Sequence, residues 1–265
     1  MNNQLHEEPR AGISIGIAAR QHRIFSSFIL GLCVLVPFFD CNVVFAFKLS
    51  PMKMVLSPSG RGASGSFTVS NESNETLAVD IHFLTRSIDA EGQEINENVD
   101  KLFMVFPPQF ALKPNKTQTV RVKWVGKTPV DKELAFRLVA EQLPISLSKG
   151  PENGVSLNVA LRYLASVYVR PKGVKEEIEM LTSVLENGSE RRLLLDFKNR
   201  GSKHAFLKNL SVKVTSEGTT ITLSPEQIDP IEGENLLAGS RRRYEIPWPA
   251  GLPSGTPEGI FSYGR

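Results

Sequence analysis

The side chains that most often carry chemistry are sparse in this sequence and lie far apart. After residue 46 the only histidines are His82 and His204, and no cysteine follows Cys41. A histidine-based triad or a metal site needs several such groups at one place. The sequence also contains no nucleophile elbow, phosphate-binding loop or dinucleotide fingerprint. We therefore expect no enzyme activity, no metal site and no cofactor.

Charged residues offer one candidate for binding. Arg137 stands between apolar neighbours in the segment 135–144. A guanidinium in such a strand either lies on the outward face or meets an anion, because an unpaired buried charge is costly. The runs Glu176–Glu179 and Arg241–Arg243 are more typical of solvated strands, although the arginines could also line a cleft between domains. The net charge of +3 is spread without a long basic run, which disfavours nucleic acid as a partner.

Short strands must position these residues. From Phe47 onward, apolar residues alternate in short segments between turn residues, and no window keeps a helical period. With 41% apolar and 22% charged residues, Gly 20 and Pro 17, the composition suits an all-β globular chain. A first set of strands matches one sandwich of the immunoglobulin type. These strands are predicted at residues 47–56, 64–70, 77–85, 102–106, 117–125, 135–141 and 156–169.

A turn-rich hinge divides the chain. Residues 170–173 read Arg-Pro-Lys-Gly, and the strand pattern restarts after them. We predict a first domain at 47–169, a hinge at 170–173 and a second, smaller β-sandwich domain at 174–265. The strands of the second domain are predicted at residues 179–185, 192–198, 205–215, 219–223, 240–246 and 260–263.

The last predicted strand of the first domain is unusually long. Residues 155–169 alternate without a turn signal, whereas strands usually contain roughly 5–6 residues. Leu157, Val159, Leu161 and Tyr163 form one apolar row. Two interpretations are open: an ordinary strand buried in its own sheet, or an edge strand whose spare apolar row receives another chain.

The N-terminal segment, residues 1–46, is typical of an export signal. Basic residues at 20–23 precede an apolar stretch at 24–36, and Ala46 offers a small residue for cleavage. An uncleaved membrane anchor is the alternative, but Pro37 and Asp40 interrupt the apolar run. We expect cleavage after Ala46, no membrane attachment of the mature chain and a bacterial periplasmic location, because eukaryotic secreted sandwiches usually carry disulfides.

Several motifs together carry a family resemblance. They are Phe106–Asn115, Gln118–Val122, Phe136–Pro144 and Val167–Pro171, with Asp196–Gly201, Leu207–Val212 and Leu236–Ser240 in the second domain. With them the chain resembles the periplasmic chaperones of the chaperone/usher pathway, which assemble surface pili in Gram-negative bacteria. The segment from Phe136 to Pro144 resembles the branch that serves spore-coat-like pilins. The resemblance implies two immunoglobulin-like sandwiches arranged as an L, and a cis peptide bond before Pro107.

The resemblance also implies a mechanism. Pilus subunits lack their own final strand, and the chaperone lends one in donor-strand complementation before an outer-membrane usher receives the subunit. Leu157, Val159 and Leu161 fall at the family's donor positions, and Tyr163 extends their row. Whether a second copy caps the exposed strand in a dimer is left open. The alternative function is that of an exported structural or adhesive two-domain protein, in which the long strand is internal.

The same resemblance implies an anchor for the subunit's C-terminal carboxylate. The family uses a basic pair, of which the first position matches Lys53, whereas the second matches Ser166, which cannot carry a charge. Arg137 is then expected to take over the carboxylate through two parallel hydrogen bonds. Glu133 and Arg170 match positions that hold the two domains together.

Overall fold

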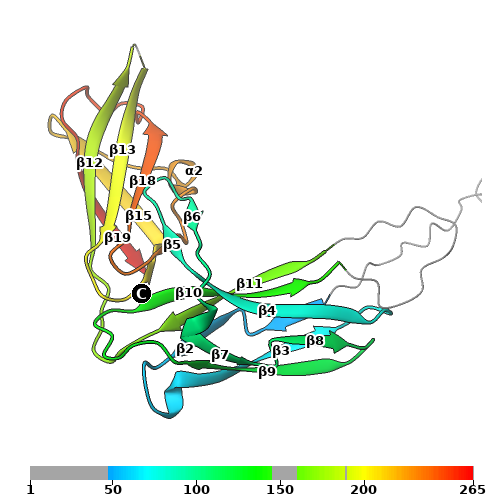
Figure 1. The fold of residues 1–265 in the computed structure, drawn as a ribbon. Coiled ribbons are helices and arrows are strands. Elements are labelled where there is room, and N and C mark those ends of the chain that lie inside the picture. The colour runs from blue at the N-terminus through cyan, green and yellow to red at the C-terminus, as the bar shows by residue number, and fades with distance from the viewer. Residues whose placement is uncertain (1–46, 145–159, 189, 265) are drawn as a thin grey trace, which may run out of the picture. The chain divides into compact units, whose positions relative to one another are not determined.

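The computed structural model describes residues 47–144, 160–188 and 190–264. The predicted export signal and two predicted donor residues, Leu157 and Val159, lie outside the described residues. Strands dominate the described part, and the prediction of an all-β chain with two immunoglobulin-like sandwiches is confirmed (Figure 1). No helix in this part is long and apolar enough to cross a membrane.

The first sandwich consists of two sheets packed around one core. Their strand orders are β1-β3-β9-β7 and β2-β11-β10-β4-β8. The strands are β1 (Phe47–Ser50), β2 (Lys53–Leu56), β3 (Ser64–Asn71), β4 (Leu77–Thr85), β7 (Phe103–Phe106), β8 (Gln109–Leu112), β9 (Thr117–Trp124), β10 (Leu134–Gln142) and β11 (Arg162–Val169). Short 3-10 turns cover Arg61–Ala63 and Asp100–Leu102. Alternate side chains of both sheets fill the core, in which Phe83 stacks on Phe103 and Trp124 lies edge-on to it.

The single strand predicted at 47–56 is wrong, because this segment forms two strands in different sheets. β1 pairs antiparallel with β3, whereas β2 pairs parallel with β11. The chain changes sheet at Pro51, which has no N–H for a ladder and is preceded by a cis peptide bond. The bond between Phe106 and Pro107 is also cis, as the resemblance implied.

Two short elements of the first sandwich were not predicted. One is β8, which follows Pro108 and pairs with β4 at the edge of the larger sheet. The other is a hairpin of β5 (Ser87–Ile88) and β6 (Glu94–Ile95), which extends from the end of β4. Two-residue strands leave too few alternating positions for a sequence pattern.

The second sandwich has its own core. Its three-stranded sheets have the orders β12-β13-β18 and β16-β15-β19, and β14 pairs with β17. The strands are β12 (Ile178–Asn187), β13 (Glu190–Asn199), β14 (Ala205–Phe206), β15 (Lys208–Ser216), β16 (Thr219–Thr222), β17 (Asn235–Leu236), β18 (Arg241–Pro247) and β19 (Glu258–Gly264). The one-turn helix α2 (Pro225–Ile228) begins at a capping box formed by Ser224 and Gln227. Leu195, Phe197 and Val212 are fully buried in this core.

Candidate functional site

The two halves of β11 are paired differently. Its second half, Ser166–Val169, pairs with β10 on one edge and with β2 on the other. Its first half, Arg162–Ala165, pairs with β10, and no other strand within the described residues takes its second edge. An unpaired strand edge is a template for the backbone of another chain.

Backbone amides identify the groups at the unpaired edge. The amides of Ser166 and Arg170 donate across the β2 edge to the carbonyls of Met52 and Leu56, at 2.9 and 2.8 Å. Amide directions alternate along a strand, so the amides of residues 162 and 164 point to this same edge. They form a regular pair of donors, spaced to match the acceptors of an added strand.

The apolar row of β11 is continuous with the core. Ala165, Val167 and Val169 are fully buried, and Leu161 and Tyr163 extend the row and pack against the same core. The Tyr163 ring lies edge-on to Phe47 with 4.8 Å between the ring centroids. The described half of the predicted donor row is therefore partly covered by the chain's own first sandwich.

The predicted anchor residues lie side by side on the opposite face of the larger sheet. Ser166 is the register partner of Lys53 on β2 and of Arg137 on β10. Register partners in adjacent strands point to the same face, so these three side chains form a row across the sheet. The structure thus brings Lys53 and Arg137 together around Ser166.

Arg137 already holds a carboxylate of the same chain. Its Nε and Nη2 donate to the two Glu94 carboxylate oxygens at 2.8 and 2.6 Å, and its Nη1 donates to Ser166 Oγ at 2.8 Å. Arg86 Nε donates to Glu94 as well, at 3.2 Å. Burial alone would raise the pKa of Glu94, but the hydrogen bond from Arg137 and the charges of Arg137 and Arg86 lower it below its usual 4.5.

Glu94 could not be found from the sequence. It lies on the two-residue strand β6, far from Arg137 along the chain, and only the tertiary fold brings the two together. The hairpin that carries it is held at its tip as well, because the amide of Arg243 on β18 donates to the Ala90 carbonyl at 2.7 Å. The arginine run at 241–243 is also not uniformly solvated, since Arg242 is buried and pairs with Glu234.

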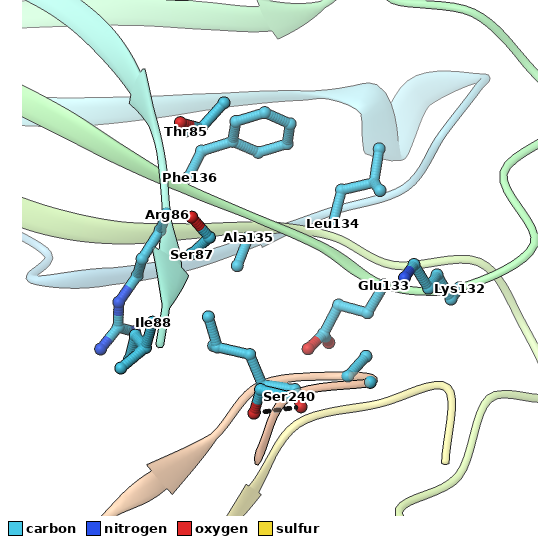
Figure 2. Close-up of a pocket in the computed structure, with 13 residues that line it drawn as sticks. Thr85, Arg86, Ser87, Ile88, Lys132, Glu133, Leu134, Ala135, Phe136 and Ser240 are labelled. Atoms are coloured by element: carbon cyan, nitrogen blue, oxygen red, sulfur yellow. Dashed lines mark hydrogen bonds between the residues drawn. The ribbon is translucent and has the colours of Figure 1, made fainter. Parts of the chain in front are cut away.

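The hairpin borders a cavity of about 390 Å³. Its walls come from residues 85–88, residues 132–136 and the loop at 237–240. Figure 2 shows the side chain of Glu133 directed toward the loop that carries Ser240.

A buried ionic network connects the two sandwiches. Glu133, with 1% of its side chain exposed, accepts hydrogen bonds from Arg170 Nε and from the backbone amide of His204, and it contacts His204 Nδ1. Burial alone would raise the pKa of Glu133, but the hydrogen bonds from His204 and Arg170 outweigh it and lower the pKa below its usual 4.5. The His204 ring stacks on Tyr168, whose hydroxyl accepts a hydrogen bond from Asn235 at 2.8 Å. Glu133 and Arg170 thus form an ion pair, and the burial of His204 beside them was not predicted.

Lys53 lies at a second cavity, of about 330 Å³. Its Nζ is 5.0 Å from the ring centroid of Phe206, and Lys208 Nζ lies 5.6 Å from the same centroid. Burial and the charges of Arg170, Lys208 and Lys203 lower the pKa of Lys53 below its usual 10.5, against the opposing charge of Glu133. Cations therefore gather at this cavity.

Among the described residues, no group of three or more His, Cys, Asp or Glu side chains is arranged to hold a metal ion. His82 instead lies on the outer face of β4 and contacts Asp80 at 3.0 Å.

Comparisons with known proteins agree with this architecture. No curated protein sequence matches the chain. Among solved structures, a chain of the CsuC–CsuE chaperone–tip adhesion subunit pre-assembly complex, from archaic chaperone-usher Csu pili of Acinetobacter baumannii, is similar with a TM-score of 0.55 and 16% identity, covering 82% of this chain and 97% of that one. The class 5 fimbriae chaperone CfaA is similar with a TM-score of 0.51 and 15% identity, covering 83% of this chain and all of that one (100%).

At these identities the likeness concerns the fold. Residues 47–175 match the model of the PapD N-terminal domain, described as pili and flagellar-assembly chaperone. This range contains the whole first sandwich, including β11 with its single-edged half. Residues 47–175 are therefore similar to the N-terminal domain of PapD, as described for pili and flagellar-assembly chaperones.

Proposed function

We propose that this protein is a periplasmic chaperone that binds and stabilises pilus or fimbrial subunits by lending them a strand, and delivers them to an outer-membrane usher. The observation that carries the proposal is the half-paired β11, whose residues 162–165 have one strand partner within the described part of the chain. A subunit that lacks one strand also has backbone groups without a strand partner. Adding its edge to β11 satisfies the backbone groups of both chains.

The direction of the added strand follows from charge. β2 runs parallel to β11 and begins beside Ser166. A subunit strand that continued the line of β2 along residues 162–165, also parallel to β11, would end at Lys53. Its C-terminal carboxylate would then meet a cation, whereas an antiparallel strand would bring its own positive N-terminus there.

The donor row is part of the same proposal. Leu157 and Val159, followed by Leu161 and Tyr163, would fill the subunit's open groove with alternate side chains. The packing of Leu161 and Tyr163 on the first core supports a rigid base from which the row extends. Leu157 and Val159 would then contribute most of the side chains that fill the subunit's groove.

The carboxylate anchor predicted from the sequence is Lys53 with Arg137. Their common row around Ser166 supports this pair. Arg137, however, has its three guanidinium nitrogens engaged by Glu94 and Ser166. A subunit carboxylate can bind the Arg137 guanidinium only if it displaces Glu94.

The remaining parts of the proposal rest on the resemblance. We infer that residues 1–46 are an export signal, that 47–169 and 174–265 are the two domains, and that Glu133 and Arg170 hold them together. We also infer that the protein catalyses no reaction, serves the branch of spore-coat-like pilins, and can cap its free edge with a second copy. The likeness of residues 136–144 to that branch supports the pilin class.

Co-expression tests the proposal. The full chain is expressed with each small exported protein encoded beside its gene, and the periplasmic extract is purified through a tag on the chain. We expect one subunit to become soluble and to co-purify in a one-to-one complex. A subunit that is equally soluble without the chain, together with display of the chain on the cell surface, would instead indicate a structural or adhesive protein.

A further inference from the structure

The cavity at Lys53 contains cations from both sandwiches. Lys53 comes from the first sandwich and Lys208 from the start of β15 in the second, and both ammonium groups lie near the ring of Phe206. Within the described residues, neither ammonium forms an ion pair with a carboxylate. We propose that Lys208 supplies the second cation for the subunit's terminal carboxylate, which binds between Lys53 and Lys208 beside Phe206 rather than on Arg137.

The nearby carboxylates are engaged elsewhere. Glu133 is held by Arg170 and His204, and Glu176 pairs with Lys203 at 2.8 Å. These contacts leave an excess of positive charge at the cavity mouth. The positive charges of these side chains repel one another. A bound anion reduces this repulsion and is therefore stabilised at the cavity.

Arg137 is less suited to the same task. Displacing Glu94 from it would leave a partly buried carboxylate that keeps its hydrogen bond from Arg86 but loses both hydrogen bonds from Arg137. Breaking such a pair costs more than the new pair returns, because the abandoned charge stays partly desolvated. Lys53 and Lys208 can receive a carboxylate without breaking a contact to another carboxylate.

Geometry favours a chain end at this cavity. The single-edged half of β11 ends at Ala165, one residue before Ser166, the register partner of Lys53. A strand added parallel to β11 brings its last carboxylate to the mouth of the cavity. Two oxygens of one carboxylate can each accept from one ammonium, and the Phe206 ring supplies an apolar wall that strengthens both contacts.

The proposal rests on the proposed function for its natural ligand, but a small probe tests the site alone. The probe is N-acetylglycine, which ends in a carboxylate, and its control is N-acetylglycinamide, which does not. Side-chain NMR signals of Lys53 and Lys208 follow the titration. We expect saturable shifts with the carboxylate only, and their loss in the Lys208→Gln variant.

Lys213→Gln is the matched control variant. It removes the same charge from an exposed position of the same strand, β15, and its probe binding should equal that of the natural chain. Lys208 is itself exposed, so its replacement should leave thermal unfolding unchanged. Probe binding that persists in Lys208→Gln, or that fails to saturate in the natural chain, would overturn the proposal.

The co-purified subunit gives the second readout. We expect Lys208→Gln to weaken subunit binding about tenfold, the usual scale of one charge-assisted hydrogen bond. A subunit ending in a carboxamide should bind about tenfold more weakly to the natural chain and show no further loss with Lys208→Gln. If the probe binds as expected but no subunit co-purifies, the anion site stands and the chaperone function fails. If Lys208→Gln binds the subunit normally while Arg137→Gln does not, the anchor is Arg137.

Discussion

The two halves of β11 have the same strand geometry but differ in pairing and burial. Residues 166–169 have a strand on each edge, a core on one face and, at Tyr168, the second sandwich on the other. Residues 162–165 have one paired edge within the described chain, and Leu164 leaves 37% of its surface exposed. The difference indicates how one strand serves two purposes. Its second half fixes the fold, and its first half keeps backbone groups ready for a partner.

The largest effect is expected in the fixed half. Val167→Asp places a charge at a position with 0% exposure, and we expect the free energy of unfolding to fall by about 4 kcal/mol or more. Urea denaturation followed by tryptophan fluorescence measures it. A stability close to that of the natural chain would mean that this half of β11 is not part of the core.

The matching change in the predicted donor row should separate binding from stability. We expect Val159→Asp to abolish co-purification of the subunit, because a charge cannot enter an apolar groove without a large desolvation cost. The urea midpoint of the free chain should stay within error of the natural value. Loss of stability equal to that of Val167→Asp would show that the row is internal core, as in a structural protein.

The network behind the fixed half should contribute strongly as well. Glu133→Gln removes a buried charge that Arg170 and His204 share, and we expect a loss of about 3 kcal/mol in the free energy of unfolding. His82→Gln is the control, since the polar contact of His82 is with the partly exposed Asp80 on the outer face of the sheet. Equal stability losses in both variants would contradict a special role for the buried network.

The same network predicts a pH dependence. The folded chain holds the pKa of Glu133 below 4.5, so its stabilising contribution is complete above pH 4.5 and is lost as the pH falls through the lower folded value. We expect the stability difference between the natural chain and Glu133→Gln to shrink between about pH 5 and about pH 3. Denaturation curves at several pH values test this, and a difference that grows on acidification would refute the sign.

The smallest effect concerns the contact of β11 with the second sandwich. Tyr168→Phe keeps the stacking on His204 but removes the hydroxyl that accepts from Asn235 and Arg86 at 2.8 and 3.0 Å. We expect a loss of about 1–2 kcal/mol, because the two donors lose their acceptor in a buried place. Thermal unfolding measures this change. Subunit binding should persist in this variant.

The sequence predicted most strands because apolar alternation is a local signal. It missed the change of sheet at Pro51, where the buried positions change from odd (Phe47, Leu49) to even (Leu56) residue numbers. It missed the hairpin of β5 and β6 because two-residue strands hold no pattern. Both misses concern how segments are assigned to sheets, which is decided by tertiary contacts.

The candidate site was likewise predicted only in part from the sequence. Lys53 and Arg137 could be singled out from their positions, and the structure places them in one row. The occupation of Arg137 by Glu94, and the approach of Lys208 to Lys53, join residues that are distant in the sequence. No spacing rule marks such pairs, so the choice between the two anchors required the fold.

Amide hydrogen exchange along β11 tests the central claim most directly. In the free chain we expect the Leu164 amide, which points to the unpaired edge, to exchange much faster than the Ser166 amide, which donates to Met52. In the complex with the co-purified subunit, the Leu164 amide should become as protected as that of Ser166, while Ser166 stays unchanged. A Leu164 amide that is already protected in the free chain, or that gains no protection in the complex, would contradict strand addition at this edge.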